Sequence, residues 1–186
     1  RDLGSAIEPF IAAAAAERGR RGLAGQPVQT GRQIGPAEVA RIMRRCGIGG
    51  PFTESEDLFR GSAAATPMEL ATALATLANR GSRPEPFLIS SIRDRADRLL
   101  YQTDPGFSPA ISADAAKEAT ACFQSRSSAR VFHGFTGSCR DAWILRLGPT
   151  GSTAIWFGFD QPAKIADSAD LEDRKSTRLN SSHRIR

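Results

Sequence analysis

Side chains that commonly bind metals or act as nucleophiles are few in this sequence and lie far apart. The three cysteines, Cys46, Cys122 and Cys139, show no CxxC spacing, so neither a zinc site nor a disulfide framework is indicated. His133 is the only histidine before the C-terminal segment, and a lone histidine is more often packed or exposed than catalytic. The glycine patterns GxGxxG and GxxxxGKS/T of nucleotide sites are absent. The sequence therefore predicts no metal and no cofactor.

The positive charge of the chain is concentrated at its C-terminal end. The formal net charge is +5, and residues 173–186 alone carry five basic groups against one acid. The preceding residues are therefore nearly neutral, and no nucleic-acid partner is expected. No run of about eighteen apolar residues is present, so no membrane-spanning helix is predicted.

The C-terminal segment itself looks foreign to the protein. Codons for the string DRKSTRLNSSH, Asp173 to His183, spell a common sequencing-library adapter, and eleven matching residues are hard to attribute to chance. We interpret residues 173–186 as an adapter-derived, disordered tail and expect the natural protein to continue differently after about Glu172. Because the chain begins with Arg1 rather than methionine, we interpret it as a fragment whose export signal or membrane anchor lies upstream.

The first predicted helix is rich in alanine. Residues 5–18 favour a helix that Ser5 could cap, with Pro9 tolerated in its first turns. Residues 23–34 are polar, contain glycine and show no periodicity. We therefore predict a loop over residues 23–34.

Two further helices carry clearer signals. Between Pro36 and Gly47, apolar side chains recur at i, i+3, i+4 and i+7, which indicates one buried helical face. Thr66, Pro67 and Glu69 fit the N-cap, N1 and N3 positions of a capping box. The second of these helices is expected to end at Gly81, a residue type that commonly follows a helix C-terminus.

After about residue 85 the hydrophobic pattern changes from the helical period to alternation. We predict one more helix, Ser112–Phe123, and the strands Phe87–Ile92, Arg98–Tyr101, Val131–Thr136, Ala142–Leu147 and Thr153–Asp160. The last two strands flank a turn-rich loop at Gly148–Ser152. Helices followed by antiparallel strands indicate an α+β fold, with residues 1–172 forming one domain. We expect the strands after Phe87, including Val131–Thr136 and Thr153–Asp160, to form one antiparallel sheet with the helix from Ser5 packed behind it.

Aromatic side chains gather in the last two predicted strands. Trp143, Trp156, Phe157 and Phe159 are most simply interpreted as core residues. The segment TAIWFGFD, Thr153 to Asp160, is β-branched and aromatic throughout, so we expect it to be buried on both faces.

Five segments resemble, in the same order, the transpeptidase domain of class A, bifunctional penicillin-binding proteins. GSAIEPF from Gly4 is similar to GSTFKPF around the family's nucleophilic serine. IGPAEVARIMRRCGI from Ile34 is similar to VGPxxVxxxARxLGI, and GSAAATPMELATALATLANRG from Gly61 to LGxxEVTPLELAxAYATFANGG. GFTGSCRDAWILRLGP from Gly134 aligns with GKTGTTxDxxDAWFVGYTP, and TAIWFGFDQP matches the strand that follows. The resemblance covers nearly all of residues 1–162.

The resemblance implies a fold, a reaction and a location. The fold would be an incomplete serine DD-transpeptidase/β-lactamase-like one, with helices packed on an antiparallel sheet. The reaction would be acylation of a serine by the D-alanyl-D-alanine stem peptide of peptidoglycan, followed by transfer to an amine. The chain would then be part of a protein at the extracytoplasmic (periplasmic) face of the bacterial inner membrane, with a glycosyltransferase domain upstream.

The same resemblance assigns site residues, and several depart from the family pattern. Ser5 stands at the nucleophile, but Glu8 occupies the position of the S-x-x-K lysine. Phe135 replaces the lysine of K-T-G, while Thr136, Gly137 and Ser138 remain as substrate-binding candidates. The resemblance also implies that Ser5 and the Thr136–Ser138 segment approach each other across one cleft. No S-x-N motif occurs between the first and second predicted helices.

These departures leave three interpretations open. The chain could be a catalytically degenerate pseudoenzyme that serves as scaffold or partner of the glycosyltransferase domain, in which case β-lactams would be doubtful ligands. It could instead be an active serine-type DD-transpeptidase, or the product of a pseudogene or an assembly artefact. A glutamate with a pKa of about 4.3 is a poor base for a serine hydroxyl, which favours the first interpretation.

Overall fold

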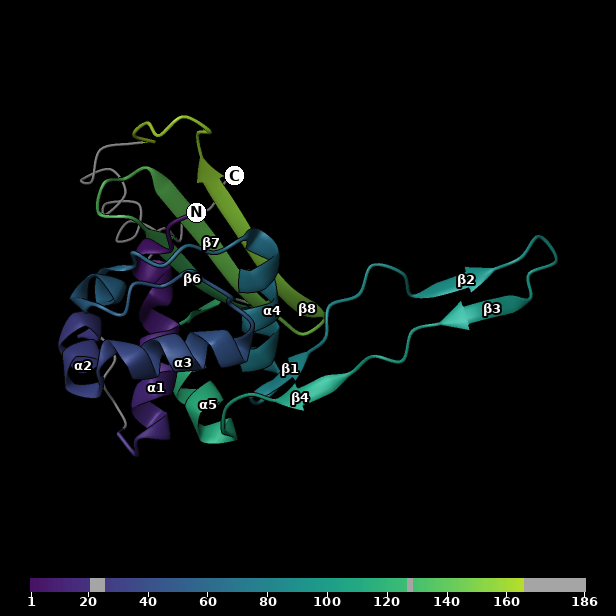
Figure 1. Ribbon diagram of the computed structural model, residues 1–186, viewed down its shortest axis with the longest axis horizontal. Helices are drawn as coiled ribbons and strands as arrows, with labels where there is room; N and C mark the ends of the chain where they lie inside the picture. Colours follow the sequence, from purple (N-terminus) through teal and green to yellow (C-terminus); the bar gives the residue numbers. More distant parts are fainter. Residues whose placement is uncertain (21–25, 127–128, 166–186) are drawn as a thin grey trace, which may run out of the picture.

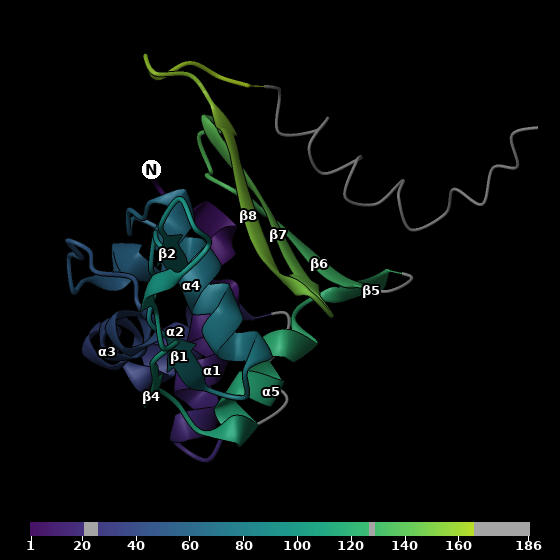
Figure 2. The same cartoon turned by 90° about the vertical axis from the view of Figure 1, so that its right-hand side faces the viewer.

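The computed structural model describes residues 1–20, 26–126 and 129–165. In this part of the chain, helices pack against one face of a four-stranded antiparallel sheet (Figures 1 and 2). The predicted α+β fold is confirmed. The predicted disordered tail, residues 173–186, lies outside the described residues.

The helical elements lie mostly in the first half of the chain. They are the 3₁₀ helix η1 (Gly4–Ile7), α1 (Glu8–Glu17), α2 (Pro27–Ile34), α3 (Pro36–Cys46), the 3₁₀ helix η2 (Glu56–Arg60), α4 (Pro67–Ala78) and α5 (Ala113–Ala121). The strands are β1 (Ser82–Pro84), β2 (Ser91–Arg93), β3 (Leu99–Gln102), β4 (Phe107–Pro109), β5 (Gln124–Arg126), β6 (Ala129–Phe135), β7 (Asp141–Gly148) and β8 (Gly151–Gly158).

Local sequence signals fix the ends of α3 and α4. The left-handed Gly47, at φ 105°, ends α3 as predicted. At the start of α4, Thr66 Oγ1 accepts a hydrogen bond from the Glu69 amide at 3.2 Å, and the Glu69 carboxylate accepts one from the Thr66 amide at 2.8 Å. The predicted capping box is confirmed, and it fixes the helix start within a single turn.

The predicted loop at residues 23–34 is wrong for residues 27–34, which form α2, and residues 23–25 lie outside the described residues. Pro27 stands in the first turn of α2, where its missing amide costs nothing. Gly31 is buried against η2, and a Cβ at this glycine would lie only 2.5 Å from the Phe59 ring. The helix therefore depends on a close contact with η2 that no periodicity within residues 27–34 could indicate.

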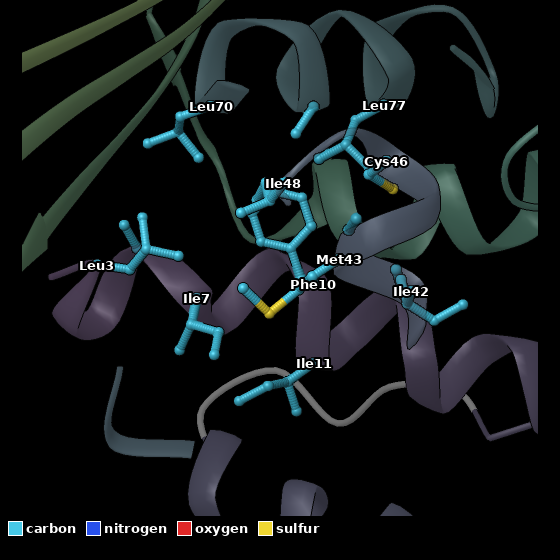
Figure 3. Packing of buried hydrophobic residues seen from close by; sticks show 14 of the residues in the cluster. Leu3, Ile7, Phe10, Ile11, Ile42, Met43, Cys46, Ile48, Leu70 and Leu77 are labelled. Atoms are coloured by element: carbon cyan, nitrogen blue, oxygen red, sulfur yellow. The ribbon is translucent and has the colours of Figure 1, made fainter. Parts of the chain in front are cut away.

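The core forms where α1, α3 and α4 meet. Figure 3 shows Phe10 of α1 in the centre of this region, with Met43, Ile48 and Leu77 among the side chains around it. These four side chains are at most 2% exposed. Burial of this kind is the main source of stability for a domain of this size.

The sheet has the order β5-β6-β7-β8, with every neighbouring pair antiparallel. The predicted strands Val131–Thr136 and Thr153–Asp160 thus lie in one sheet, as expected. The β7–β8 pairing continues to Gly148 and Gly151, so the hairpin turn is tighter than the predicted loop.

Strand β8 has one half-buried face and one exposed face, so the prediction that it is buried on both faces is wrong. Its side chains alternate, and Trp156 packs against the core while Phe157 and Phe159 are 47% and 54% exposed. The prediction that all four aromatic residues belong to the core holds for Trp143 but fails for these two phenylalanines. The reason is that the described helices cover only one face of the sheet (Figure 2).

Strands β2 and β3 form a separate ribbon that projects from the body (Figure 1). The expectation that all strands after Phe87 share one sheet is therefore wrong. Local contacts close the ribbon: the Asp94 carboxylate accepts hydrogen bonds from the Ala96 and Arg98 amides and pairs with the Arg98 side chain. Such a ribbon satisfies its own pairing, so alternation alone could not predict its separation from the main sheet.

We expect Thr66→Ala to lower the free energy of unfolding by about 1 kcal/mol, because the Glu69 amide loses its capping acceptor. Thr72→Ala, on the same helix, is the matched control: the Thr72 hydroxyl bonds back to the Met68 carbonyl, and alanine has the higher helix propensity. The control should therefore change stability by less than about 0.5 kcal/mol. Urea unfolding followed by circular dichroism measures both, and equal losses would contradict the capping role.

Candidate functional site

Helix η1 lies against the edge of β6 and brings Ser5 to that strand. The Phe135 amide donates a hydrogen bond to Ser5 Oγ at 3.0 Å, across a separation of 130 residues along the chain. The predicted approach of Ser5 to the Thr136–Ser138 segment is thus observed. Ser5 is not a helix cap, however, because η1 begins before it and no side chain caps either η1 or α1.

Two glycines make this approach possible. Gly4 has φ +51°, and a Cβ there would lie 2.0 Å from the Phe135 carbonyl oxygen. Gly61, at φ +84°, packs on the other side of Gly4, where a Cβ would lie 2.0 Å from the Gly4 carbonyl oxygen. The Gly4 amide also donates to the Gly61 carbonyl at 3.1 Å. Both positions require glycine because of the backbone conformation and because of the contact.

The side chain of Glu8 lies near the end of α5. Burial raises the pKa of the Cys122 thiol to about 11, and the nearby Glu8 and Glu118 carboxylates add to the increase because a second negative charge is disfavoured. Glu8 is half-buried at the first position of α1. The side chain three residues after Ser5 is therefore an acidic one that lies close enough to the Cys122 thiol to influence its ionisation.

Thr136 holds the turn between β6 and β7. Its hydroxyl oxygen accepts hydrogen bonds from the Arg140 and Asp141 amides, both at 3.1 Å. Its amide donates to the Asp141 carbonyl at 3.0 Å, and the Ser138 hydroxyl donates to Thr136 Oγ1 at 3.4 Å. Thr136 is 8% exposed, so its side chain closes the turn rather than facing solvent.

The remaining predicted substrate-binding residues lie around this turn. A Cβ at Gly137 would have no neighbour within 4 Å, so the Gly137 backbone is open to an approaching molecule. Ser138 lines a pocket of about 220 Å³ together with Arg1, Asp2, Arg140, Asp141, Phe159 and Pro162. The two arginines and two aspartates among these lining residues give the pocket no net formal charge.

Phe135 contributes its backbone rather than a charged side chain. Phe135 is paired with Ala142 of β7 in the sheet, and its backbone amide donates the hydrogen bond to Ser5 Oγ. The described part of the chain contains two lysines, Lys117 on α5 and Lys164 after β8. Neither position corresponds to a lysine predicted by the resemblance.

Among residues 1–20, 26–126 and 129–165, no group of three or more His, Cys, Asp or Glu side chains could hold a metal ion. No helix in these ranges is long and apolar enough to cross a membrane. Burial raises the pKa of Cys46 to about 12, so its thiol stays protonated and packs as an apolar side chain.

Comparison with known proteins decides the family. A sequence model of the penicillin binding protein transpeptidase domain matches residues 28–138, more than half of the chain. The chain belongs to this family. Penicillin-binding protein 2D of Bacillus subtilis is 25% identical over 170 residues, which cover 81% of this chain and 24% of that protein. The chain therefore spans about a quarter of the length of this relative.

Solved structures show the same transpeptidase fold. Penicillin-binding protein 1A of Haemophilus influenzae superposes with a TM-score of 0.79 at 18% identity, over 100% of this chain and 43% of that chain. The D,D-transpeptidase domain of a peptidoglycan glycosyltransferase from Eggerthella lenta gives a TM-score of 0.71 at 15% identity, over 96% of this chain and 65% of the other.

Sequence reasoning missed the glycines that build the contact at Ser5. Gly4 and Gly61 each begin a segment that resembles the family, so their positions were noted without a physical role. The signal that could have identified them is glycine at the start of two apolar segments that must approach each other closely. Trp143 was also predicted only as a core residue, but its indole also donates to the Asp2 carbonyl at 2.9 Å.

We expect Gly4→Ala to destabilise the domain by about 3 kcal/mol or more, because the new methyl group meets the Phe135 carbonyl in a left-handed backbone conformation. Gly137→Ala is the matched control, since a Cβ there meets nothing within 4 Å. It should change stability by less than about 1 kcal/mol. Denaturant unfolding monitored by tryptophan fluorescence distinguishes the two, and a harmless Gly4→Ala would contradict the close approach.

Proposed function

We propose that residues 1–172 form a transpeptidase domain of a peptidoglycan-synthesis protein that no longer forms an acyl-enzyme. The observation that supports this is the contact of Ser5: the hydroxyl at the nucleophile position accepts a hydrogen bond from the Phe135 amide, and its neighbour one turn on is Glu8. The serine is kept in place, but a base suited to accept its proton is missing from both lysine positions.

The chemistry of serine acylation supports this proposal. A serine hydroxyl attacks a carbonyl effectively only when a base accepts its proton. A carboxylate with an ordinary pKa of about 4.3 is too weak a base at neutral pH, and loss of general-base assistance costs about 10²–10⁴ in rate. With Glu8 in place of lysine, Ser5 is expected to remain protonated.

Charge supports the same proposal. The substrate of the family ends in a carboxylate, so two lysines would attract it, whereas Glu8 and Phe135 together contribute one negative charge. The pocket beside Ser138 has no net charge that could compensate, because two aspartates balance its two arginines. Binding of the stem peptide should therefore be weak as well as unproductive.

We further propose that the domain acts as a scaffold next to a glycosyltransferase domain of the same protein. The chain spans about a quarter of the length of Penicillin-binding protein 2D, and the Eggerthella lenta domain is described as part of a peptidoglycan glycosyltransferase. A protein of this kind would work at the extracytoplasmic (periplasmic) face of the inner membrane, with its anchor outside residues 1–172. Its partners would be the glycosyltransferase domain and the peptidoglycan that this domain makes.

Labelling with a fluorescent penicillin tests the loss of acylation. We expect the purified 186-residue chain to show no label above the Ser5→Ala background, because neither the base nor the anion-binding charge is present. A catalytically intact class A transpeptidase in the same gel is the positive control. Label on the unaltered chain that disappears in Ser5→Ala would show an active serine enzyme and overturn the proposal.

The double variant Glu8→Lys with Phe135→Lys tests the reason for the loss. Restored, Ser5-dependent labelling would support the two lysine positions as the cause. Each single variant is the matched control, since either lysine alone leaves one part of the site incomplete. If one single variant were labelled as strongly as the double variant, the requirement for lysine at both positions would be contradicted.

A further inference from the structure

A second pocket lies at the other end of the sheet from Ser5. It has a volume of about 560 Å³ and is formed by α4, α5 and strands β6 and β7 (Figure 2 shows these elements together). Its lining residues are Leu77, Ala78, Arg80, Ala113, Asp114, Ala116, Lys117, Thr120, Arg130 and Leu147. In the β6–β7 register, Arg130 pairs with Leu147 and Phe135 pairs with Ala142, so the pocket and the Ser5 contact are separated by about 17 Å along the strand.

The pocket combines an apolar floor with converging positive charges. Leu77, Ala116 and Leu147 are at most 8% exposed and form its buried side. Three cationic side chains and a single acidic one, Asp114, line the pocket, which leaves an excess of two positive charges.

The cationic side chains are available to a ligand. Within the described part of the chain, the side chains of Arg80 and Lys117 have no hydrogen bond or ion pair. The Arg130 guanidinium donates one bond, to the Thr120 carbonyl at 3.2 Å, and keeps its other donors. No protein carboxylate within the described residues is therefore paired with Arg80 or Lys117.

Arg80 is also held in an unfavourable backbone conformation. Its φ is +54°, in the left-handed region that favours glycine. The family pattern that the segment Gly61–Gly81 resembles reads ANGG at its end, where this chain reads ANRG. An arginine at this position costs backbone free energy that glycine would not, and packing does not compensate for it, since Arg80 is exposed. Strain of this kind is consistent with a side chain required for function.

We propose that this pocket binds a phosphate monoester that carries a small apolar group. A phosphate monoester has a charge of about −1.5 to −2 at pH 7, which matches the excess of two positive charges. Guanidinium groups bind phosphate oxygens through paired hydrogen bonds, and Arg80 and Arg130 can provide them from α4 and β6. The apolar group would cover Leu77 and Leu147, and the volume suits a small molecule.

Titration calorimetry with phenyl phosphate at about 0.1 M salt tests the proposal. We expect the 186-residue chain to bind phenyl phosphate with a dissociation constant of about 1 mM or lower. Inorganic phosphate, which lacks the apolar group, and phenol, which lacks the charge, should each bind at least about tenfold more weakly. Failure to bind phenyl phosphate, or equal binding of any two probes, would overturn the proposal.

Two variants separate binding from folding. Arg80→Gly should weaken phenyl phosphate binding by about tenfold and at the same time raise the melting temperature, because glycine relieves the left-handed backbone. Arg130→Gln should weaken binding by a similar factor. Arg45→Gln, on the exposed side of α3, removes the same charge away from the pocket and is the matched control. If Arg45→Gln weakened binding as much as Arg80→Gly, the effect would be one of net charge and the site would be refuted.

Discussion

The domain depends on the contact between η1 and the edge of β6. Gly4 lies directly against the Phe135 carbonyl, and the Phe135 amide donates to Ser5 Oγ at 3.0 Å. This contact joins the first helical turn to a strand more than a hundred residues later and thereby fixes how the helices sit on the sheet. Gly61 supports it from the opposite side, so that three backbone segments meet with no room for a side chain.

The same contact gives the residues at the family's site a structural role that does not depend on catalysis. Ser5 and Gly4 are needed to build the junction, whatever the residue at position 8. The Thr136 hydroxyl likewise accepts hydrogen bonds from the Arg140 and Asp141 amides and so closes the turn between β6 and β7. This structural role is independent of any substrate. Residues that carry the family resemblance at this site therefore have reasons to be retained that do not require catalysis, and this is consistent with the proposed loss of acylation.

The sequence predicted those parts of the fold whose signals are local. The Thr66–Glu69 capping box and the left-handed Gly47 define helix ends within one turn, and both are found where predicted. Helix α2 was missed because Gly31 weakens its local preference and only packing against Phe59 explains it. The exposure of Phe157 was missed because an apolar, β-branched strand has the same composition at a sheet edge as in a core.

For the site, the resemblance predicted which residues approach each other, while their contacts could come only from the structure. Ser5 was expected near Thr136–Ser138, but its hydrogen bond comes from the backbone of Phe135, which no side-chain pattern encodes. The pocket around Arg80 was not predicted, because its lining residues come from helices and strands distant in sequence. Its one local signal was an arginine where the family pattern has glycine.

Hydrogen exchange at the Phe135 amide tests the central contact most directly. In the unaltered chain this amide donates to Ser5 Oγ, so it should exchange slowly. Ser5→Ala removes the acceptor, and we expect exchange at Phe135 to become at least about tenfold faster, while the Leu70 amide within α4 keeps its rate. An unchanged rate at Phe135 in Ser5→Ala would show that the serine does not hold η1 to β6 and would contradict the account.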